Sequence, residues 1–220
     1  MGLSELIANA AQSYPEAKTG TFTGAAIGRD FKDKIPNALK QATNLDDFIV
    51  KGSIGNGNFA DVPWIAIMDR DITSSTTKGV YIVFLFSSDG KRVYLSFNQG
   101  VTYFREQKIA DQDVRTISRK IGEKYPTSDS VVNHIDLSAS TALAKGYEKT
   151  NIYSYEYHTD NMPSDEAIIE NLESLVSKYR DLKVAFVEAG SSIEAFYSSF
   201  DMTKAPNKYV IFKRLLRRFI

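Results

Sequence analysis

Apolar positions recur with two periods along the chain, which predict helices at both ends and strands between them. A period of three to four residues predicts a helix over 111–125 and another that begins after Ser164. Extended segments are expected at 47–54, 62–68, 79–86, 92–97 and 151–158. This order predicts an α+β fold, a single domain whose mixed, mostly antiparallel β-sheet is flanked by helices.

The helix boundaries carry local signals of their own. Residues 3–13 are expected to form a helix that ends at Pro15, and a second helix over 30–43 is interrupted or started at Pro36. Ser164 is an N-cap residue, and the acids that follow it favour the N-terminal end of the helix dipole.

The strand segments differ in how they alternate. Residues 79–86 are apolar on both faces, which predicts a central, buried strand. Asp89-Gly90 predicts a hairpin turn into the next strand. In 92–97 apolar and polar residues alternate, so this strand is expected to be half exposed.

Composition excludes several classes of protein. The 220 residues include 43% hydrophobic residues, which excludes wholesale disorder, and no cysteine, which excludes a disulfide scaffold and a thiolate metal site. No signal peptide or membrane-length apolar run is visible, so a soluble, cytoplasmic protein is expected, without membrane association. Lys and Arg total 27, as do Asp and Glu, and this zero net charge argues against a broadly basic nucleic-acid binder.

Common catalytic motifs are absent from the sequence. It lacks a phosphate-binding P-loop, a dinucleotide-binding glycine motif and a G-x-S-x-G nucleophile elbow. No cofactor, metal or catalytic residue is therefore expected in this chain. Two alternatives stay open: a small metal-dependent nuclease or hydrolase that uses His158, Asp160 and Glu156, and a protein-interaction module of a defence complex. The second would use exposed aromatic residues, namely Tyr153, Tyr155 and Tyr157.

The most distinctive segment is 53–68, with sequence SIGNGNFADVPWIAIM. Gly55 and Gly57 flank Asn56 and allow positive φ angles and a close approach of the backbone to a ligand. Val62-Pro63 then leads to Trp64, the only tryptophan. Without further information, Trp64 and the apolar strand that follows are more typical of a core than of a ligand site.

The pattern G-x-G-N-F-x-x-V-P-W, followed by the strand GVYIVFLF at 79–86, resembles the N-terminal DNA-binding domain of the McrB family. The similarity spans about residues 45–158. That family recognises modified cytosine for a McrBC-type restriction system, which acts against foreign DNA. The resemblance implies a reader that flips 5-methyl- or 5-hydroxymethylcytosine out of the duplex into an aromatic pocket and itself cuts nothing.

The resemblance also assigns roles to individual residues. The pocket tryptophan corresponds to Trp64, the tyrosine and leucine of the next strand to Tyr81 and Leu85, and a later tyrosine to Tyr147. Tyr81 and Leu85 are an even number of positions apart, so one face of a strand can present both. The family has an aromatic wedge between the two glycines, where this chain has Asn56.

The expected DNA-contacting loop comprises Gly55, Asn56, Gly57, Asn58 and Phe59. Phosphate contacts are expected from Lys51 and from the basic segment 206–220, through Lys213, Arg214, Arg217 and Arg218.

The domain is expected to span 1–200, followed over 201–220 by a basic C-terminal helix or a lead into a further domain. Its expected partners are double-stranded DNA with a modified cytosine and a GTPase or endonuclease domain or subunit. The zero net charge is compatible with a domain that holds one extruded base and contacts phosphate only through these local basic residues.

Overall fold

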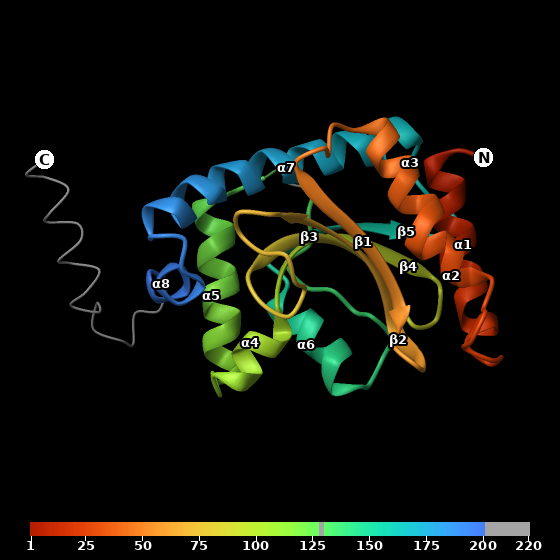
Figure 1. Cartoon of the computed structure of the whole chain (residues 1–220), viewed down its shortest axis with the longest axis horizontal. Coiled ribbons are helices and arrows are strands. Elements are labelled where there is room, and N and C mark those ends of the chain that lie inside the picture. The colour runs from red at the N-terminus through yellow and green to blue at the C-terminus, as the bar shows by residue number, and fades with distance from the viewer. Residues whose placement is uncertain (128–129, 201–220) are drawn as a thin grey trace, which may run out of the picture.

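A computed structural model describes residues 1–127 and 130–200 of the chain and confirms the α+β fold. Its sheet has five strands in the order β1-β2-β3-β4-β5, and every pairing is antiparallel (Figure 1). The strands are β1 (Phe48–Gly55), β2 (Phe59–Asp69), β3 (Val80–Phe86), β4 (Arg92–Gln99) and β5 (Tyr153–His158). Each strand therefore lies beside its neighbours in sequence, although a helical insertion separates β4 from β5.

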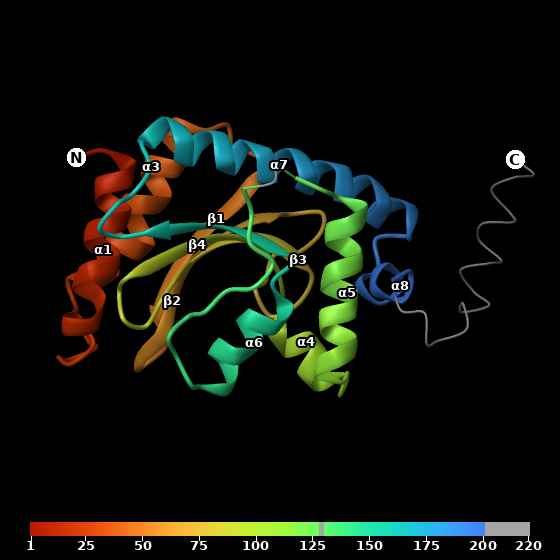
Figure 2. The ribbon, with the colours of Figure 1, turned by 180° about the vertical axis from the view of Figure 1, so that it is seen from behind.

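Helices enclose the sheet (Figures 1 and 2). The N-terminal ones are α1 (Leu3–Ala17), α2 (Ile27–Arg29), the π-helix η1 (Asp30–Lys34) and α3 (Ile35–Ala42). Between β4 and β5 lie α4 (Val101–Glu106), α5 (Asp111–Lys124) and α6 (Ala142–Thr150). The last two described helices are α7 (Asp165–Glu188) and α8 (Ile193–Ser198). Among the described residues, no helix is both long and apolar enough to cross a membrane.

The two faces of the sheet belong to separate apolar clusters. On one face, alternate strand residues such as Ile65, Ile82 and Phe84 pack against α1, α3, α5, α7 and α8 and form the large cluster. On the other face lies the small cluster, covered by α6 and the preceding segment 131–141. The small cluster consists of Val62, Ala66, Met68, Tyr81, Val83, Leu85, Tyr94, Ile135, Leu137, Ala144 and Tyr147. Strand β3 contributes to both clusters and is buried along its whole length, as its sequence predicts.

The prediction that β4 is half exposed was wrong. Tyr94 is 1% exposed and Ser96 is fully buried, although both lie on the face that was expected to meet solvent. The segment 131–141 covers this face, and the hydroxyl of Tyr94 lies 3.2 Å from the carbonyl oxygen of Asp136. The alternation in β4 therefore reflects two different buried environments.

The expectation of exposed aromatic residues on β5 was also wrong. Tyr153, Tyr155 and Tyr157 are each 5% exposed or less, because they face the large cluster beneath α7. The hydroxyl of Tyr157 accepts a hydrogen bond from Asn171 of α7 at 3.0 Å. These rings cannot form the exposed contact surface of an interaction module in this structure.

The helix boundaries agree only in part with those predicted from the sequence. Pro15 does not end α1, which continues to Ala17, and the second helical segment begins at Ile27, with a π-helix immediately before α3. Pro36 lies in the first turn of α3, directly after the π-helix, so it does not interrupt the helical segment. Ser164 is the N-cap of α7, as predicted.

Candidate nucleic-acid interface

The glycine-rich segment is the tip of the β1–β2 hairpin. Gly55 pairs with Phe59, and the intervening residues Asn56, Gly57 and Asn58 are exposed. The expected positive φ angles are present, +119° at Gly55 and +74° at Gly57. A Cβ atom on Gly55 would lie 2.0 Å from the carbonyl oxygen of Asn58, so only glycine fits there.

The base of the hairpin is attached to α1. The hydroxyl of Tyr14 donates to the carbonyl of Ala60 at 2.7 Å and lies 3.1 Å from the carbonyl oxygen of Ile54, so it spans both strands. The ring of Phe59 meets the rings of Tyr14 and Phe22 edge-on, with centroids 6.0 and 5.2 Å apart. Phe59 is therefore turned into the protein at the base of the hairpin, and it is the tip residues that face solvent.

An ionic contact holds the second strand of the hairpin. The ammonium of Lys18 pairs with the carboxylate of Asp61. Hydrogen bonding from Lys18 lowers the pKa of Asp61, and Thr141, the N-cap residue of α6, contributes a further hydrogen bond. Asp61 thus connects the hairpin to α1 and to the start of α6.

The four pocket residues suggested by the resemblance lie on one face of the molecule. Tyr81, Leu85 and Tyr147 belong to the small cluster, and Trp64 packs against it. Trp64 on β2 stands directly opposite Leu85 on β3. Tyr81 and Leu85 share a face of β3, as their spacing predicts, while helix α6 supplies Tyr147.

This group is uncharged and mostly closed. The hydroxyl of Tyr81 lies 3.1 Å from the carbonyl oxygen of Thr76, and burial raises the Tyr81 pKa well above its ordinary value. Burial also raises the pKa of Tyr147 to about 12. Trp64 is only half-buried, whereas Tyr81 and Leu85 are buried. The four side chains therefore form an apolar, neutral group whose exposed member is Trp64.

Trp64 marks the boundary between the covered and the open part of this face. On the β1 side, Ser53 stands opposite Trp64 and Lys51 stands opposite Ala66. The side chain of Lys51 is exposed and forms no ion pair with any described residue. An approaching ligand would thus meet Lys51, Ser53 and the indole of Trp64 together.

Other predicted residues lie elsewhere. Lys213, Arg214, Arg217 and Arg218 lie outside the described residues. The imidazole Nε2 of His158 is 3.8 Å from a carboxylate oxygen of Glu156, and both His158 and Asp160 are exposed. Over residues 1–127 and 130–200, no group of three His, Cys, Asp or Glu side chains could hold a metal ion.

Two residues near the site were not predicted. Tyr94 stands directly opposite Leu85, and its hydroxyl lies 3.1 Å from the carboxylate of Glu156. Tyr14 holds the hairpin from a helix about forty positions earlier in the chain. The alternation of β4 predicted that Tyr94 would face solvent, and local sequence carries no signal for the role of Tyr14.

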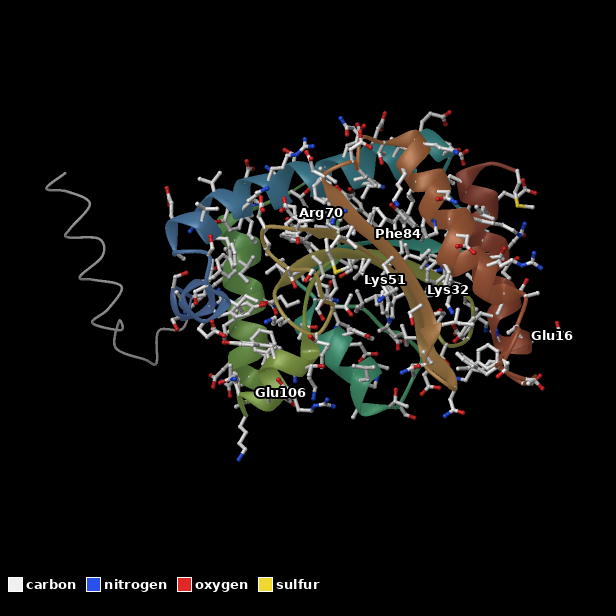
Figure 3. The ribbon with its side chains drawn as sticks, viewed as in Figure 1. Glu16, Lys32, Lys51, Arg70, Phe84 and Glu106 are labelled. Carbon is white, nitrogen blue, oxygen red and sulfur yellow. The ribbon has the colours of Figure 1, made fainter. Side chains whose placement is uncertain are left out.

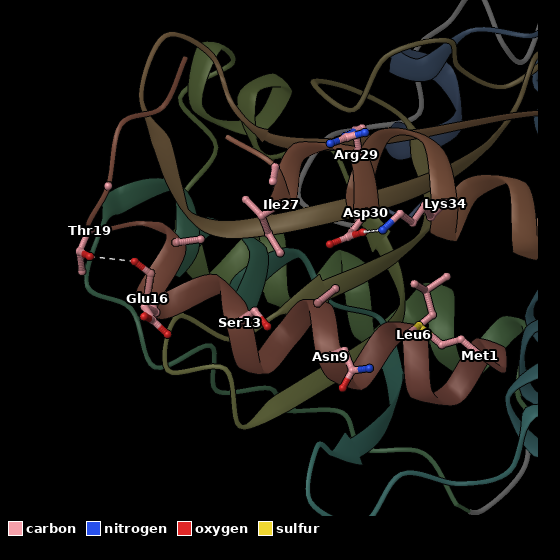
Figure 4. Close-up of a pocket in the computed structure, with 14 residues that line it drawn as sticks. Met1, Leu6, Asn9, Ser13, Glu16, Thr19, Ile27, Arg29, Asp30 and Lys34 are labelled. Atoms are coloured by element: carbon pink, nitrogen blue, oxygen red, sulfur yellow. Dashed lines mark hydrogen bonds and ion pairs between the residues drawn. The ribbon is translucent and has the colours of Figure 1, made fainter. Parts of the chain in front are cut away.

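Two surface hollows lie near the N-terminal helices. The larger, about 740 Å³, lies between α1 and the segment 26–34 and is lined by charges of both signs, including Glu16, Arg29 and the ion pair of Asp30 with Lys34 (Figure 4). The smaller, about 500 Å³, is lined by Phe22, Arg29, Lys32 and Ile54, among others. None of the four pocket residues lines either hollow.

Comparison with known proteins adds one match. A protein-family model described as "MrcB-like, N-terminal domain" matches residues 9–184. The matched range contains the β1–β2 hairpin, the small cluster and Trp64. No curated protein sequence matches the chain.

Proposed function

The chain belongs to the MrcB-like, N-terminal domain family, and on this premise we propose that it recognises modified cytosine in double-stranded DNA for a McrBC-like restriction system. In this proposal the modified base leaves the duplex and is held between aromatic side chains. The chain acts as a binding module, and nucleotide hydrolysis and DNA cleavage belong to another domain or subunit.

The observation that carries the proposal is the convergence of Trp64, Tyr81, Leu85 and Tyr147 beside an exposed glycine hairpin. These residues come from β2, β3 and α6, so the fold gathers them from distant parts of the chain. Stacking of an unpaired base on an aromatic ring contributes about 1–3 kcal/mol, which offsets the cost of unstacking it from the duplex.

In this proposal the base enters beside Trp64. The indole is the half-buried member of the group and borders the open part of the sheet face at β1. Tyr81 and Leu85 lie deeper, and Tyr147 is 7% exposed. Binding therefore requires the indole, or the ring of Tyr147, to move so that the base can reach the small cluster.

The chemistry of the group favours an apolar modification. A 5-methyl group that becomes buried contributes about 0.8 kcal/mol, a preference of roughly fourfold. A 5-hydroxymethyl group brings a hydroxyl that needs a hydrogen-bonding partner, and the hydroxyl of Tyr81 already lies against main-chain carbonyls. We therefore expect 5-methylcytosine to bind more tightly than 5-hydroxymethylcytosine.

The hairpin tip is proposed to face the site that the base leaves. Asn56 and Asn58 are exposed on a turn whose backbone the two glycines determine. Their amides can hydrogen-bond to base edges, but neither fills the vacated space as an aromatic ring would.

The test is a gel shift with matched duplexes at one fixed salt concentration. The native chain should bind the duplex with 5-methylcytosine more tightly than the same duplex with cytosine. Trp64→Ala should abolish the difference. Tyr103→Ala is the matched control, because Tyr103 is a half-buried aromatic residue that packs against the large cluster. Equal binding of both duplexes by the native chain, or an undiminished preference in Trp64→Ala, would refute the proposal.

A further inference from the structure

Three cations lie on the two elements that meet at one edge of the sheet, the helical segment 27–42 and the edge strand β1. Arg29 and Lys32 both line the smaller hollow, at the base of the β1–β2 hairpin. Figure 3 shows Lys51 on β1 and Lys32 on the helical segment that packs against this strand. All three side chains belong to exposed residues.

Main-chain packing sets the helical segment that carries Lys32 against β1, the strand that carries Lys51. A Cβ atom on Gly52 would lie only 1.8 Å from the carbonyl oxygen of Phe31, the residue before Lys32. Gly52 follows Lys51 directly. The absence of a side chain at Gly52 therefore lets the helical segment approach β1. Gly52 and Lys51 point to opposite faces of the sheet, so the segment that carries Lys32 and the side chain of Lys51 lie on either side of this edge strand.

These cations are not neutralised within the described protein. Arg29, Lys32 and Lys51 form no ion pair with any residue in 1–127 or 130–200. Of the nearby acids, Asp30 is paired with Lys34 at 2.7 Å, and Asp33 lines the same hollow. The edge thus presents three free cations against one unpaired acid.

We infer that Arg29, Lys32 and Lys51 form a phosphate-binding edge that holds the DNA backbone beside the flipped base. Lys51 lies on the same sheet face as Trp64, two positions along β1 from the residue opposite it. The hollow that Arg29 and Lys32 line is bordered by Ile54, next to Gly55 of the hairpin. A DNA strand whose base reached Trp64 would pass its flanking phosphates over this edge.

The edge also accounts for how a chain with zero net charge could bind DNA. Attraction to phosphate depends on local charge, because salt screens charges more than about 10 Å away. Acids elsewhere on the surface therefore weaken binding at this edge only slightly. This inference rests on the proposed function, since an edge for DNA phosphates has a role only if the chain binds DNA.

The test is the salt dependence of binding by the whole chain with Arg29→Gln, Lys32→Gln and Lys51→Gln combined. Each lost phosphate contact should reduce the slope of log affinity against log salt by about 0.9, or roughly 2.7 for three contacts. Affinity for methylated and plain duplexes should fall by the same factor, about tenfold near physiological salt. The preference between the two duplexes should not change.

The matched control combines Arg105→Gln, Arg115→Gln and Arg180→Gln. These three arginines are exposed on α4, α5 and α7 and, within the described residues, take part in no ion pair. They should leave the slope unchanged. A native slope in the Arg29, Lys32 and Lys51 variant, or an equal loss in the control, would overturn the phosphate-binding edge. Absence of any preference in the native chain would instead overturn the proposed function.

Discussion

The two faces of the sheet are both buried, but they are covered in different ways. The large cluster is enclosed by α1, α3, α5, α7 and α8 through apolar packing. The small cluster is covered by α6 and the segment 131–141, which has little regular structure. Buried polar residues concentrate under this second cover, and they connect it to the sheet by hydrogen bonds.

Asn151 is the centre of these hydrogen bonds. Its side-chain oxygen accepts from the hydroxyls of Ser96 and Ser154, each at 2.7 Å. Its amide nitrogen donates to the carbonyl of Asn133 at 3.2 Å. Nearby, the amide of Asn98 donates to the carbonyl of Tyr147 at 3.3 Å.

Burial alone therefore does not distinguish a core from a ligand site. Apolar packing by several helices gives a face that opens only with global unfolding, whereas a short helix and a loop held by a few hydrogen bonds can open locally. We therefore expect the small-cluster face to be the one that admits a ligand.

The largest expected effect comes from truncating adjacent residues of β3 that face opposite clusters. Phe84→Ala removes a fully buried ring from the large cluster and should lower the free energy of unfolding by about 3–5 kcal/mol. Leu85→Ala creates a smaller cavity in the small cluster and should cost about 2–3 kcal/mol. Urea denaturation measures both.

The binding readout separates the two variants further. Below the temperature at which each unfolds, Leu85→Ala should lose the preference for 5-methylcytosine, and Phe84→Ala should keep it. A preference lost in Phe84→Ala and kept in Leu85→Ala would reverse the roles assigned to the two faces.

The next effect concerns the hairpin, whose base is attached to the large-cluster side by Tyr14 and Phe59. Gly55→Ala should cost about 2–3 kcal/mol, because its positive φ and its contact with Asn58 both exclude a side chain. Gly57→Ala has the same φ restriction but open space around it, so about 1 kcal/mol is expected. Thermal denaturation should show a larger loss of stability for Gly55→Ala than for Gly57→Ala. Equal losses would argue against the close contact between Gly55 and Asn58.

A smaller effect tests the cover of the small cluster directly. Asn151→Ala removes the partner of Ser96 and Ser154 and should cost about 1–3 kcal/mol. Hydrogen exchange should become faster in 131–141 and α6. The control Asn171→Ala removes a hydrogen bond to Tyr157 on the large-cluster side and should leave exchange in these segments unchanged. Faster exchange throughout the chain in Asn151→Ala would mean that this cover is not an independent unit.

The smallest effect is the pH dependence at Asp61, which contacts both α1 and the start of α6. The pKa of Asp61 is lowered in the folded protein, chiefly by its hydrogen bond from Lys18. The contribution of Asp61 to the free energy of unfolding is therefore fully present above the ordinary aspartate pKa. It is lost as the pH falls through the lowered pKa of the folded protein. Native protein should be more stable than Asp61→Asn at pH 7, and this difference should shrink in acid. A difference that stays constant from pH 7 to pH 3 would contradict the assignment.

Local patterns in the sequence predicted the parts of the fold that depend on neighbouring residues. The burial of β3, the positive φ angles at Gly55 and Gly57 and the N-cap at Ser164 all follow from residue type and period. The burial of Tyr94 could not be predicted in this way, because segment 131–141 has no helical or strand period that would identify it as a cover. Tyr153 was misjudged for the same reason, since an alternating strand does not reveal which of its faces a distant helix will cover.

The candidate site was predictable only with the family resemblance. Period and spacing place Tyr81 and Leu85 on one face but do not distinguish a pocket from a core. The resemblance singled out Trp64 and Tyr147, which lie 83 positions apart in the sequence, and the fold brings them to the same cluster. The bonds from Tyr14 to the hairpin and the approach of Phe31 to Gly52 are long-range contacts that one sequence does not encode locally.

Recognition of the modified base at Trp64 can be tested directly by the fluorescence of this residue, the only tryptophan in the chain. A base stacked against this indole should quench and shift its emission, and no second indole obscures the signal. At saturating DNA, the duplex with 5-methylcytosine should change the emission clearly more than the matched plain duplex does. Identical emission with both duplexes, at concentrations where both are bound, would contradict recognition of the modified base at Trp64.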